Sequence, residues 1–174
     1  MATIKSMCIV VCLSVMAAGL LGFAPYATGE TLNYKLFNHP TKIESFPLPD
    51  AAGHEVMFMV REGVNIFENG ELAWVKAVNV RDVTKGVGTF DMYATITFPD
   101  GSMILIRTKG TTQATPAGVQ SAAEWTGDII YGTGRFQGIK GTQTTSSKLF
   151  PLEKGELGGK SIGQGTFNYT LPPK

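Results

Sequence analysis

The segment Tyr131-Gly-Thr-Gly-Arg-Phe-Gln-Gly-Ile-Lys-Gly-Thr142 carries glycines at positions 132, 134, 138 and 141. A dinucleotide-binding fingerprint places glycines at relative positions one, three and six and opens a helix, whereas here the third glycine comes one residue late. A polar, β-prone run follows, so no helix N-terminus can meet a phosphate. The pattern therefore predicts a strand, a tight turn and a second strand starting near Gly141, with Phe136 buried and Arg135 exposed or paired with a carboxylate.

The chain from residue 54 onward alternates apolar and polar side chains, which is typical of strands with one buried face. The alternation is clearest at residues 87–98, where one face carries only apolar side chains. Asn69-Gly70 and Asp100-Gly101 predict tight hairpin turns between neighbouring strands. The apolar face of residues 87–98 consists of Phe90, Met92, Ala94, Ile96 and Phe98.

Eight to nine short strands and almost no helical pattern predict an all-β domain, and we expect a closed antiparallel barrel because closure removes exposed strand edges. Glycines spaced two apart, at 132 and 134 and at 163 and 165, mark places where a strand bends or another group approaches closely. The expected strands cover residues 32–37, 54–61, 64–67, 71–81, 87–98, 102–109, 123–131, 142–148 and 161–171.

Residues 132–141, Gly-Thr-Gly-Arg-Phe-Gln-Gly-Ile-Lys-Gly, resemble the GGTG-[RK]-F-x-G-x-x-G segment of the allene oxide cyclase and dirigent barrel superfamily. Phe-Pro-Asp-Gly-Ser-Met at 98–103 and Glu-Trp-Thr-Gly at 124–127 resemble neighbouring segments of its small bacterial members. The resemblance implies an eight-stranded antiparallel barrel. In the plant cyclases the interior holds a fatty-acid epoxide, and in dirigent proteins it orients phenolic radicals. No catalytic residue of those proteins can be matched here, and fold alone does not define function.

The N-terminus carries the marks of an export signal. Lys5 precedes an uncharged, mostly apolar run at residues 7–23, and small residues near Gly29 offer a cleavage site. The sequence leaves open whether residues 1–29 are cleaved or retained as an anchor, because the apolar run reaches the lower limit of about 17 residues for crossing a bilayer. We expect a single exported domain at 30–174, either periplasmic or secreted.

Composition excludes several classes of function for that domain. Cys8 and Cys12 both lie in the signal, so the mature domain has no thiol. Without Lys5, the 15 Lys and Arg become 14, equal to the 14 Asp and Glu, so no basic surface for nucleic acid is expected. His39 and His54 are too few for a histidine zinc site, and no metal-binding spacing occurs. We expect neither a cofactor nor a metal.

Residues with inward-facing patterns are the candidates for a ligand site. His54 falls in register with Val56, Phe58 and Val60, which makes it a candidate buried acid or base. Eight strands can enclose either packed side chains or one small ligand, and the sequence does not decide between them. Asp91 and Tyr93 are expected on the outer face, where they could form a homo-oligomer interface. The candidate ligand-lining residues are Val56, Phe58, Phe90, Met92, Ile104, Trp125 and Tyr131.

These observations support three hypotheses for function. The first is a barrel that binds a small apolar or aromatic molecule without turnover. The second is a cyclase or isomerase that acts on a hydrophobic substrate by confinement, which needs few polar groups. The third is a filled barrel that binds other proteins through the loops at 111–119 and 151–160.

Overall fold

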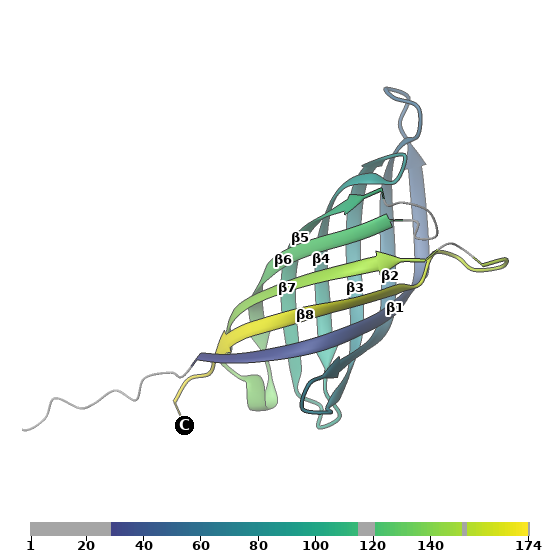
Figure 1. The fold of residues 1–174 in the computed structure, drawn as a ribbon. Helices are drawn as coiled ribbons and strands as arrows, with labels where there is room; N and C mark the ends of the chain where they lie inside the picture. The colour runs from purple at the N-terminus through teal and green to yellow at the C-terminus, as the bar shows by residue number, and fades with distance from the viewer. Residues whose placement is uncertain (1–28, 115–120, 151–152, 174) are drawn as a thin grey trace, which may run out of the picture.

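A computed structural model describes residues 29–114, 121–150 and 153–173 (Figure 1). Eight strands pair in sequence order, each antiparallel to the next, and β8 pairs with β1, so the predicted closed eight-stranded antiparallel barrel is confirmed. The leader predicted at 1–29, with both cysteines, lies outside the described residues except for Gly29. The strands are β1 Gly29–Pro47, β2 His54–Phe67, β3 Leu72–Thr84, β4 Val87–Thr97, β5 Met103–Gln113, β6 Ser121–Gly132, β7 Lys140–Leu149 and β8 Ser161–Thr170.

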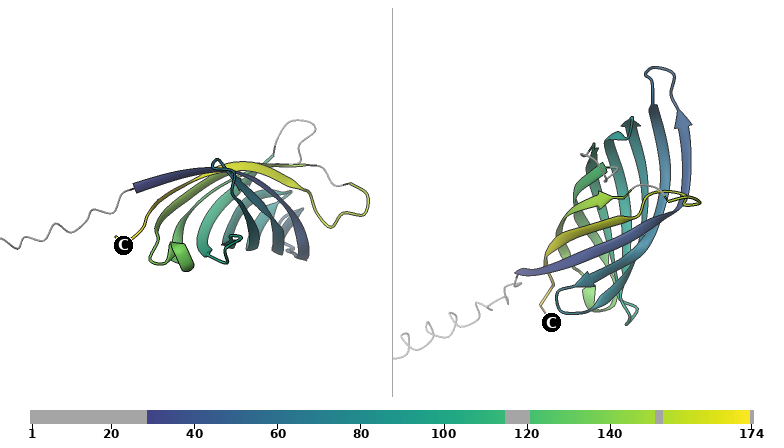
Figure 2. Two further views of the ribbon diagram at one scale, coloured as in Figure 1. Left: turned by 90° about the horizontal axis from the view of Figure 1, so that it is seen from below. Right: turned by 45° about the vertical axis from the view of Figure 1, so that its right-hand side comes forward.

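Strand β1 is much longer than the expected segment at 32–37. Its pairing with β8 ends at Asn38, whereas its pairing with β2 continues to Pro47. The β1–β2 hairpin therefore projects beyond the rest of the strongly curved sheet (Figures 1 and 2). The two segments expected at 54–61 and 64–67 form one continuous strand, β2. In the described part of the chain, no helix is long and apolar enough to cross a membrane.

Aromatic side chains fill the end of the barrel opposite the projecting hairpin. Phe98 lies between two other rings, with centroid distances of 5.4 Å to Phe67 and 4.7 Å to Phe136. Phe167 stacks on Tyr34 at 5.0 Å. Ring pairs at such distances stabilise a fold by about 0.5–1.5 kcal/mol each beyond their buried area. This end of the barrel, the aromatic base, is solid.

The glycine segment closes the aromatic base. Gly134–Phe136 forms a single 3₁₀ turn, η1, between β6 and β7, and Phe136 is 6% exposed. Gly134 has φ +58°, and a Cβ there would lie 2.4 Å from Ser102 Oγ, so the turn requires glycine. Arg135 Nη2 lies 2.6 Å from Glu71 Oε1, and its guanidinium covers the rings of Phe98 and Phe136. Both predictions for this segment, a buried Phe136 and a paired Arg135, are confirmed.

A second glycine lets a large side chain enter the barrel from the neighbouring strand. Tyr34 on β1 lies opposite Gly165 on β8, and a Cβ at Gly165 would lie 2.3 Å from the Tyr34 hydroxyl. The missing side chain leaves the tyrosine room to cross the interior toward β7. Its hydroxyl hydrogen-bonds with Gln143 and Thr145 there. Gly165 thus positions a polar group at the boundary between the aromatic base and the rest of the interior.

Candidate ligand-binding site

A cavity of about 60 Å³ lies inside the barrel, between the aromatic base and the end that carries the β1–β2 turn. Every strand except β5 contributes to its wall. At about 10–15 Å³ for each water, the space holds about four to six water molecules. The apolar wall includes Leu36, Met59, Phe90, Met92, Trp125 and Leu149, and the polar wall includes Asn38, Arg61, Asn65, Asn79, Arg81, Gln143, Ser147 and Ser161.

Arg61 is the most deeply buried cation of the polar wall, with 8% of its surface exposed. Its Nε donates to Asn38 Oδ1 at 2.6 Å, Nη2 donates to the Gly159 carbonyl at 2.8 Å, and Nη1 lies 3.3 Å from Met59 Sδ. All three acceptors are neutral. Burial, and then the nearby charge of Arg81, lower the pKa of Arg61 to about 10, so it stays charged at neutral pH. In the described structure, no carboxylate lies within ion-pair distance of the Arg61 guanidinium.

Arg81 follows Asn79 on the same face of β3, farther from the aromatic base. Its Nη2 donates to Thr112 Oγ1 on β5, and its Nε is buried without a hydrogen-bond partner. Burial lowers the pKa of Arg81, whereas the negative charge of Glu55 raises it by a smaller amount. Glu55 makes no ion pair with it and accepts a hydrogen bond from Ser45 instead. Two cations thus share the polar wall without a carboxylate bound to either.

The cavity also collects the buried polar atoms that lack hydrogen-bond partners. Seven such side-chain atoms occur among the described residues, and six belong to residues of the cavity wall. Leaving a buried polar atom unpaired costs about 1–3 kcal/mol, so their concentration in one place indicates a site that water or a ligand completes. The six are Asn65 Oδ1, Asn79 Oδ1, Arg81 Nε, Trp125 Nε1, Gln143 Oε1 and Ser147 Oγ.

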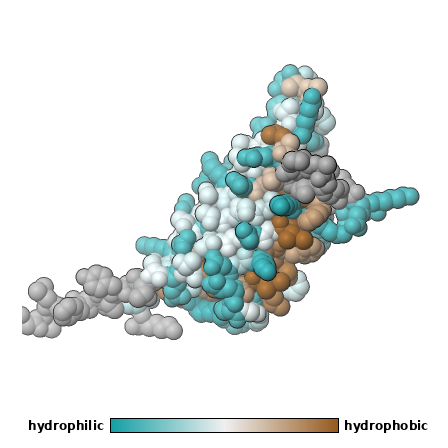
Figure 3. Space-filling model, in the orientation of Figure 1, coloured by the Kyte–Doolittle hydropathy of each residue, from teal (hydrophilic) through white to brown (hydrophobic). Residues whose placement is uncertain are grey.

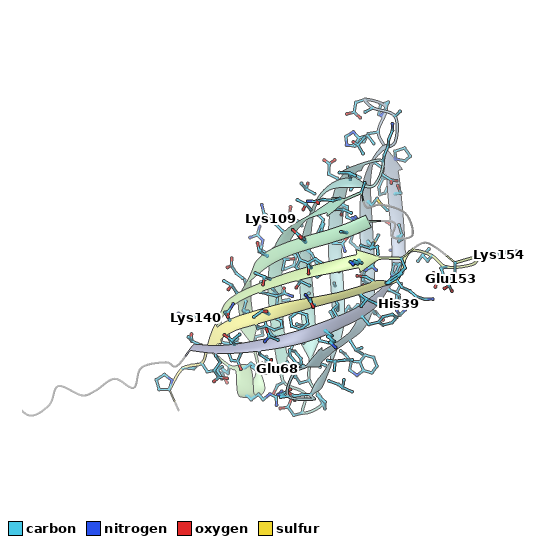
Figure 4. All side chains as sticks on the ribbon, viewed as in Figure 1. His39, Glu68, Lys109, Lys140, Glu153 and Lys154 are labelled. Atoms are coloured by element: carbon cyan, nitrogen blue, oxygen red, sulfur yellow. The ribbon has the colours of Figure 1, made fainter. Side chains whose placement is uncertain are left out.

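Charged side chains elsewhere lie on the outside of the barrel. His39, Glu68, Lys109 and Lys140 point away from it, as Figure 4 shows. A hollow of about 980 Å³ on the surface is a trough across the outer face of β5–β8, β1 and β2, lined largely by threonine, serine and charged side chains. The space-filling view shows this outer face over β5–β8 as mostly of intermediate hydropathy (Figure 3). We place the candidate site inside, because the unpaired polar atoms and the apolar wall are there.

Tyr34 separates the cavity from the aromatic base. Its hydroxyl interacts with the side chains of Gln143 and Thr145, and burial raises its pKa to about 12 despite those hydrogen bonds. The phenol therefore stays neutral at physiological pH. Its role is to hold the side chain of Gln143 in place. The amide nitrogen of Gln143 donates to the hydroxyls of Tyr34 and Thr145, while its amide oxygen has no hydrogen-bond partner.

His54, the candidate acid or base, does not belong to the cavity wall; it is the first residue of β2, and its ring is partly exposed at this strand end. It sits beside the β1–β2 turn with its side chain 16% exposed, Nδ1 2.6 Å from Asp50 Oδ1 and Nε2 2.9 Å from Asp82 Oδ1. The hydrogen bond with Asp82, followed by that with Asp50, raises its pKa. Carboxylates on both ring nitrogens stabilise the doubly protonated ring and leave no free nitrogen for a base, so the geometry gives His54 a structural role.

The candidate lining residues separate into two groups. Phe90, Met92 and Trp125 lie along the cavity wall, and Ile104 is buried in the core. The expected inward direction of Val56, Phe58 and Tyr131 is wrong. On β2 the opposite face points inward. On β6, Ile130 bulges out of the pairing with β5, so that Tyr131 lies opposite Leu105 and is 54% exposed.

The error on β2 has a physical cause. The greater hydrophobicity of Val56, Phe58 and Val60 predicts that their face of β2 points inward. In the structure the other face does so, with Met59, Arg61, Asn65 and Phe67. Buried polar groups are tolerated where they find partners, as Arg61 does with Asn38 and Gly159. The outward ring of Phe58 instead lies beneath Lys42, with Nζ 5.7 Å from its centroid.

Sequence reasoning therefore missed the polar half of the site. A signal for it exists on β3, where Asn79 and Arg81 continue the alternation of Ala73, Val75 and Ala77 and precede Val83 in the same phase. Polar residues in phase with a buried apolar series predict a polar interior just as the apolar series predicts a core. Asp91 and Tyr93 do lie on the outer face as expected, with Lys109 Nζ 3.8 Å from Asp91.

The fold and site define the chain as a closed eight-stranded antiparallel barrel with a small internal cavity. No family model matches the sequence, and no curated protein is similar to it in sequence. Among solved structures it is similar to the pterocarpan synthase dirigent protein GePTS1, with 14% identity, a TM-score of 0.52, and coverage of 85% of this chain and 94% of that one. A second pterocarpan synthase dirigent protein, PsPTS1, has 13% identity and a TM-score of 0.46, with coverage of 84% and 97%. The similarity to GePTS1 agrees with the barrel fold that the resemblance of residues 132–141 implies.

Proposed function

We propose that this protein is an exported barrel that binds a small molecule with an apolar or aromatic body inside the barrel and releases it unchanged. The observation that carries the proposal is the cavity, whose wall combines the apolar side chains of Phe90, Met92 and Trp125 with six unpaired polar atoms. Ligand sites in proteins combine such a mostly apolar wall with a few polar groups that fix orientation. The dirigent-type fold of a pterocarpan synthase is compatible with this use of the interior.

The cavity as it stands is smaller than an aromatic ligand, so binding requires side chains to move. Met59 and Met92 line it, and methionine side chains are flexible enough to repack around a ligand. Both arginine side chains are also long and can redirect their ends. The packed rings of the aromatic base cannot move aside in this way, so we expect the ligand to enter from the end that carries the β1–β2 turn.

Binding without turnover is supported by the ionisable groups on the described wall. They are Tyr34, which burial keeps neutral, and the two guanidinium groups of Arg61 and Arg81, of which Arg61, with a pKa of about 10, is charged at neutral pH. General acid or base catalysis works best when the pKa of the group lies near the working pH, and none of these three groups meets that condition. A cyclase or isomerase that acts by confinement alone is the second candidate, because it needs no such group.

Export and self-association are proposed from the sequence alone. The leader at 1–29 supports export to the periplasm or medium. An interface between copies of the chain would fall on the outer face around Tyr93, which is 48% exposed. An interaction module acting through its loops remains the third candidate.

The chain offers an internal reporter for the test. It has two tryptophans, of which Trp74 is 71% exposed outside the barrel and Trp125 lines the cavity. In a Trp74→Phe protein, the single indole N–H of Trp125 gives one resolved ¹⁵N–¹H signal. We expect 1-hexanol, a small amphipathic probe, to shift this signal in a saturable manner.

A cavity-blocking variant provides the control. Ala94 lines the cavity, so Ala94→Leu fills it, whereas Thr89→Leu adds an apolar side chain to the outer face of the same strand. We expect Ala94→Leu to abolish the shift of the Trp125 signal caused by 1-hexanol, and Thr89→Leu to retain it. Mass spectrometry of the material extracted from the purified protein then separates a carrier from an enzyme. An unchanged molecule supports binding without turnover, and a rearranged one supports the cyclase.

A further inference from the structure

Among the described residues, the polar wall of the cavity holds two positive charges and no negative one. Arg61 makes its three contacts with neutral acceptors, and Arg81 makes one, to a threonine hydroxyl. Burying a charge is costly unless an opposite charge or several hydrogen bonds offset the loss of water. The pKa of Arg61 is lowered by its burial and, to a smaller extent, by the like charge of Arg81. The barrel therefore contains a pair of cations that its own described residues do not neutralise.

One acidic side chain approaches this pair and does not neutralise it. Glu55 interacts with Arg81 only at long range and is hydrogen-bonded by Ser45 near the turn. The other carboxylates around the turn, Asp50 and Asp82, are engaged by His54. The negative charges at this end of the barrel thus have partners, whereas Arg61 and Arg81 retain unused capacity to bind an anion.

We infer that the molecule held in the barrel is an amphipathic anion, such as a small carboxylate, whose charged group is bound between Arg61 and Arg81 and whose apolar part lies against Phe90, Met92 and Trp125. This inference rests on the proposed function and specifies its ligand. The geometry fits because a guanidinium presents planar N–H donors that match a carboxylate. Arg81 Nε is such a donor without a partner, and Trp125 Nε1 and Ser147 Oγ offer further polar atoms on the wall.

The competing explanation is that the arginines only hold the structure together. Arg61 does link β1 and β2 to the chain at Gly159, so part of its role is structural. Arg81 has only the hydrogen bond to Thr112 to explain its burial. Arg81 is therefore the residue that separates the two explanations.

The test compares hexanoate, 1-hexanol and hexylamine, which share one apolar chain and differ in charge, on the full-length Trp74→Phe protein. The Trp125 indole signal and isothermal titration calorimetry measure binding. We expect hexanoate to bind at least tenfold tighter than 1-hexanol, and hexylamine to bind more weakly than either. We expect Arg81→Met to weaken hexanoate binding at least tenfold while it changes the affinity for 1-hexanol by less than about twofold.

Controls keep the outcomes separate. Arg107→Met removes the same charge from the outer face, where Arg107 lies over Tyr93, and should leave hexanoate binding unchanged. Arg81→Lys should retain part of the affinity, because it retains the charge. Equal binding of hexanoate and 1-hexanol, or an equal effect of Arg107→Met and Arg81→Met, would overturn the anion inference and leave the proposed function standing. No response of Trp125 to any of the three probes would contradict both.

Discussion

Truncation of Phe136 tests whether the glycine segment closes a packed core. The ring is 6% exposed, its centroid lies 4.7 Å from that of Phe98, and the Arg135 guanidinium carbon lies 4.8 Å from it. Replacing a buried phenylalanine with alanine costs about 3–5 kcal/mol, a large part of the 5–15 kcal/mol that stabilises a typical domain. At about 3–4 °C for each kcal/mol in a domain of this size, Phe136→Ala should lower Tm by roughly 10–20 °C.

Urea denaturation followed by tryptophan fluorescence measures this loss directly. The denaturation midpoint should fall while the dependence of the unfolding free energy on urea stays constant, because the unfolded surface hardly changes. Tyr131→Ala, a truncation on the outer face of β6, serves as control and should change stability by no more than about 0.5 kcal/mol. A loss below about 1 kcal/mol for Phe136→Ala would refute the solid aromatic base.

Three further predictions address other parts of the barrel. His54 has a raised pKa in the folded protein, so its contribution to stability is complete below the unfolded pKa of 6.5 and is lost as the pH rises through the folded pKa. His54→Asn should remove this part of the pH dependence of stability, measured by denaturation curves recorded from pH 5 to 9. Gly165→Ala should cost about 1–3 kcal/mol by urea denaturation because its Cβ meets Tyr34. Tyr34→Phe should cost about 1–3 kcal/mol by the same assay, since Gln143 loses a buried partner; an unchanged midpoint would exclude this role for the hydroxyl.

The fold followed from the sequence because local patterns and pairing agree over most of the chain. The alternation of β4 and the turns at Asn69-Gly70 and Asp100-Gly101 each specify a strand or a reversal on their own. Eight strands in sequence order then close without any crossover. On β4 one face is purely apolar and the other polar, and there the predicted inward face, with Phe90 and Met92, is confirmed.

The site was harder to predict from the sequence. Its polar half contradicts the rule that the more hydrophobic face of a strand points inward. Hydrophobicity alone assigned Phe58 to the interior and Arg61 to the outside, whereas the closed barrel needs the reverse to satisfy Asn38 and the chain at Gly159. The bulge at Ile130 shifts the phase of β6 by one residue, and no turn or glycine signal marks that position. Such errors fall where the interior departs from a plain apolar core, which is where functional sites are commonly found.

A crystal structure of the protein with 6-bromohexanoate, in which anomalous scattering locates the bromine, shows directly where the ligand binds. We expect a single bromine peak inside the barrel near Phe90, Met92 and Trp125, with the carboxylate at Arg61 and Arg81. A peak in the outer trough beside Thr126 and Thr144, or an unchanged interior at saturating ligand, would contradict the claim that this barrel binds its ligand within.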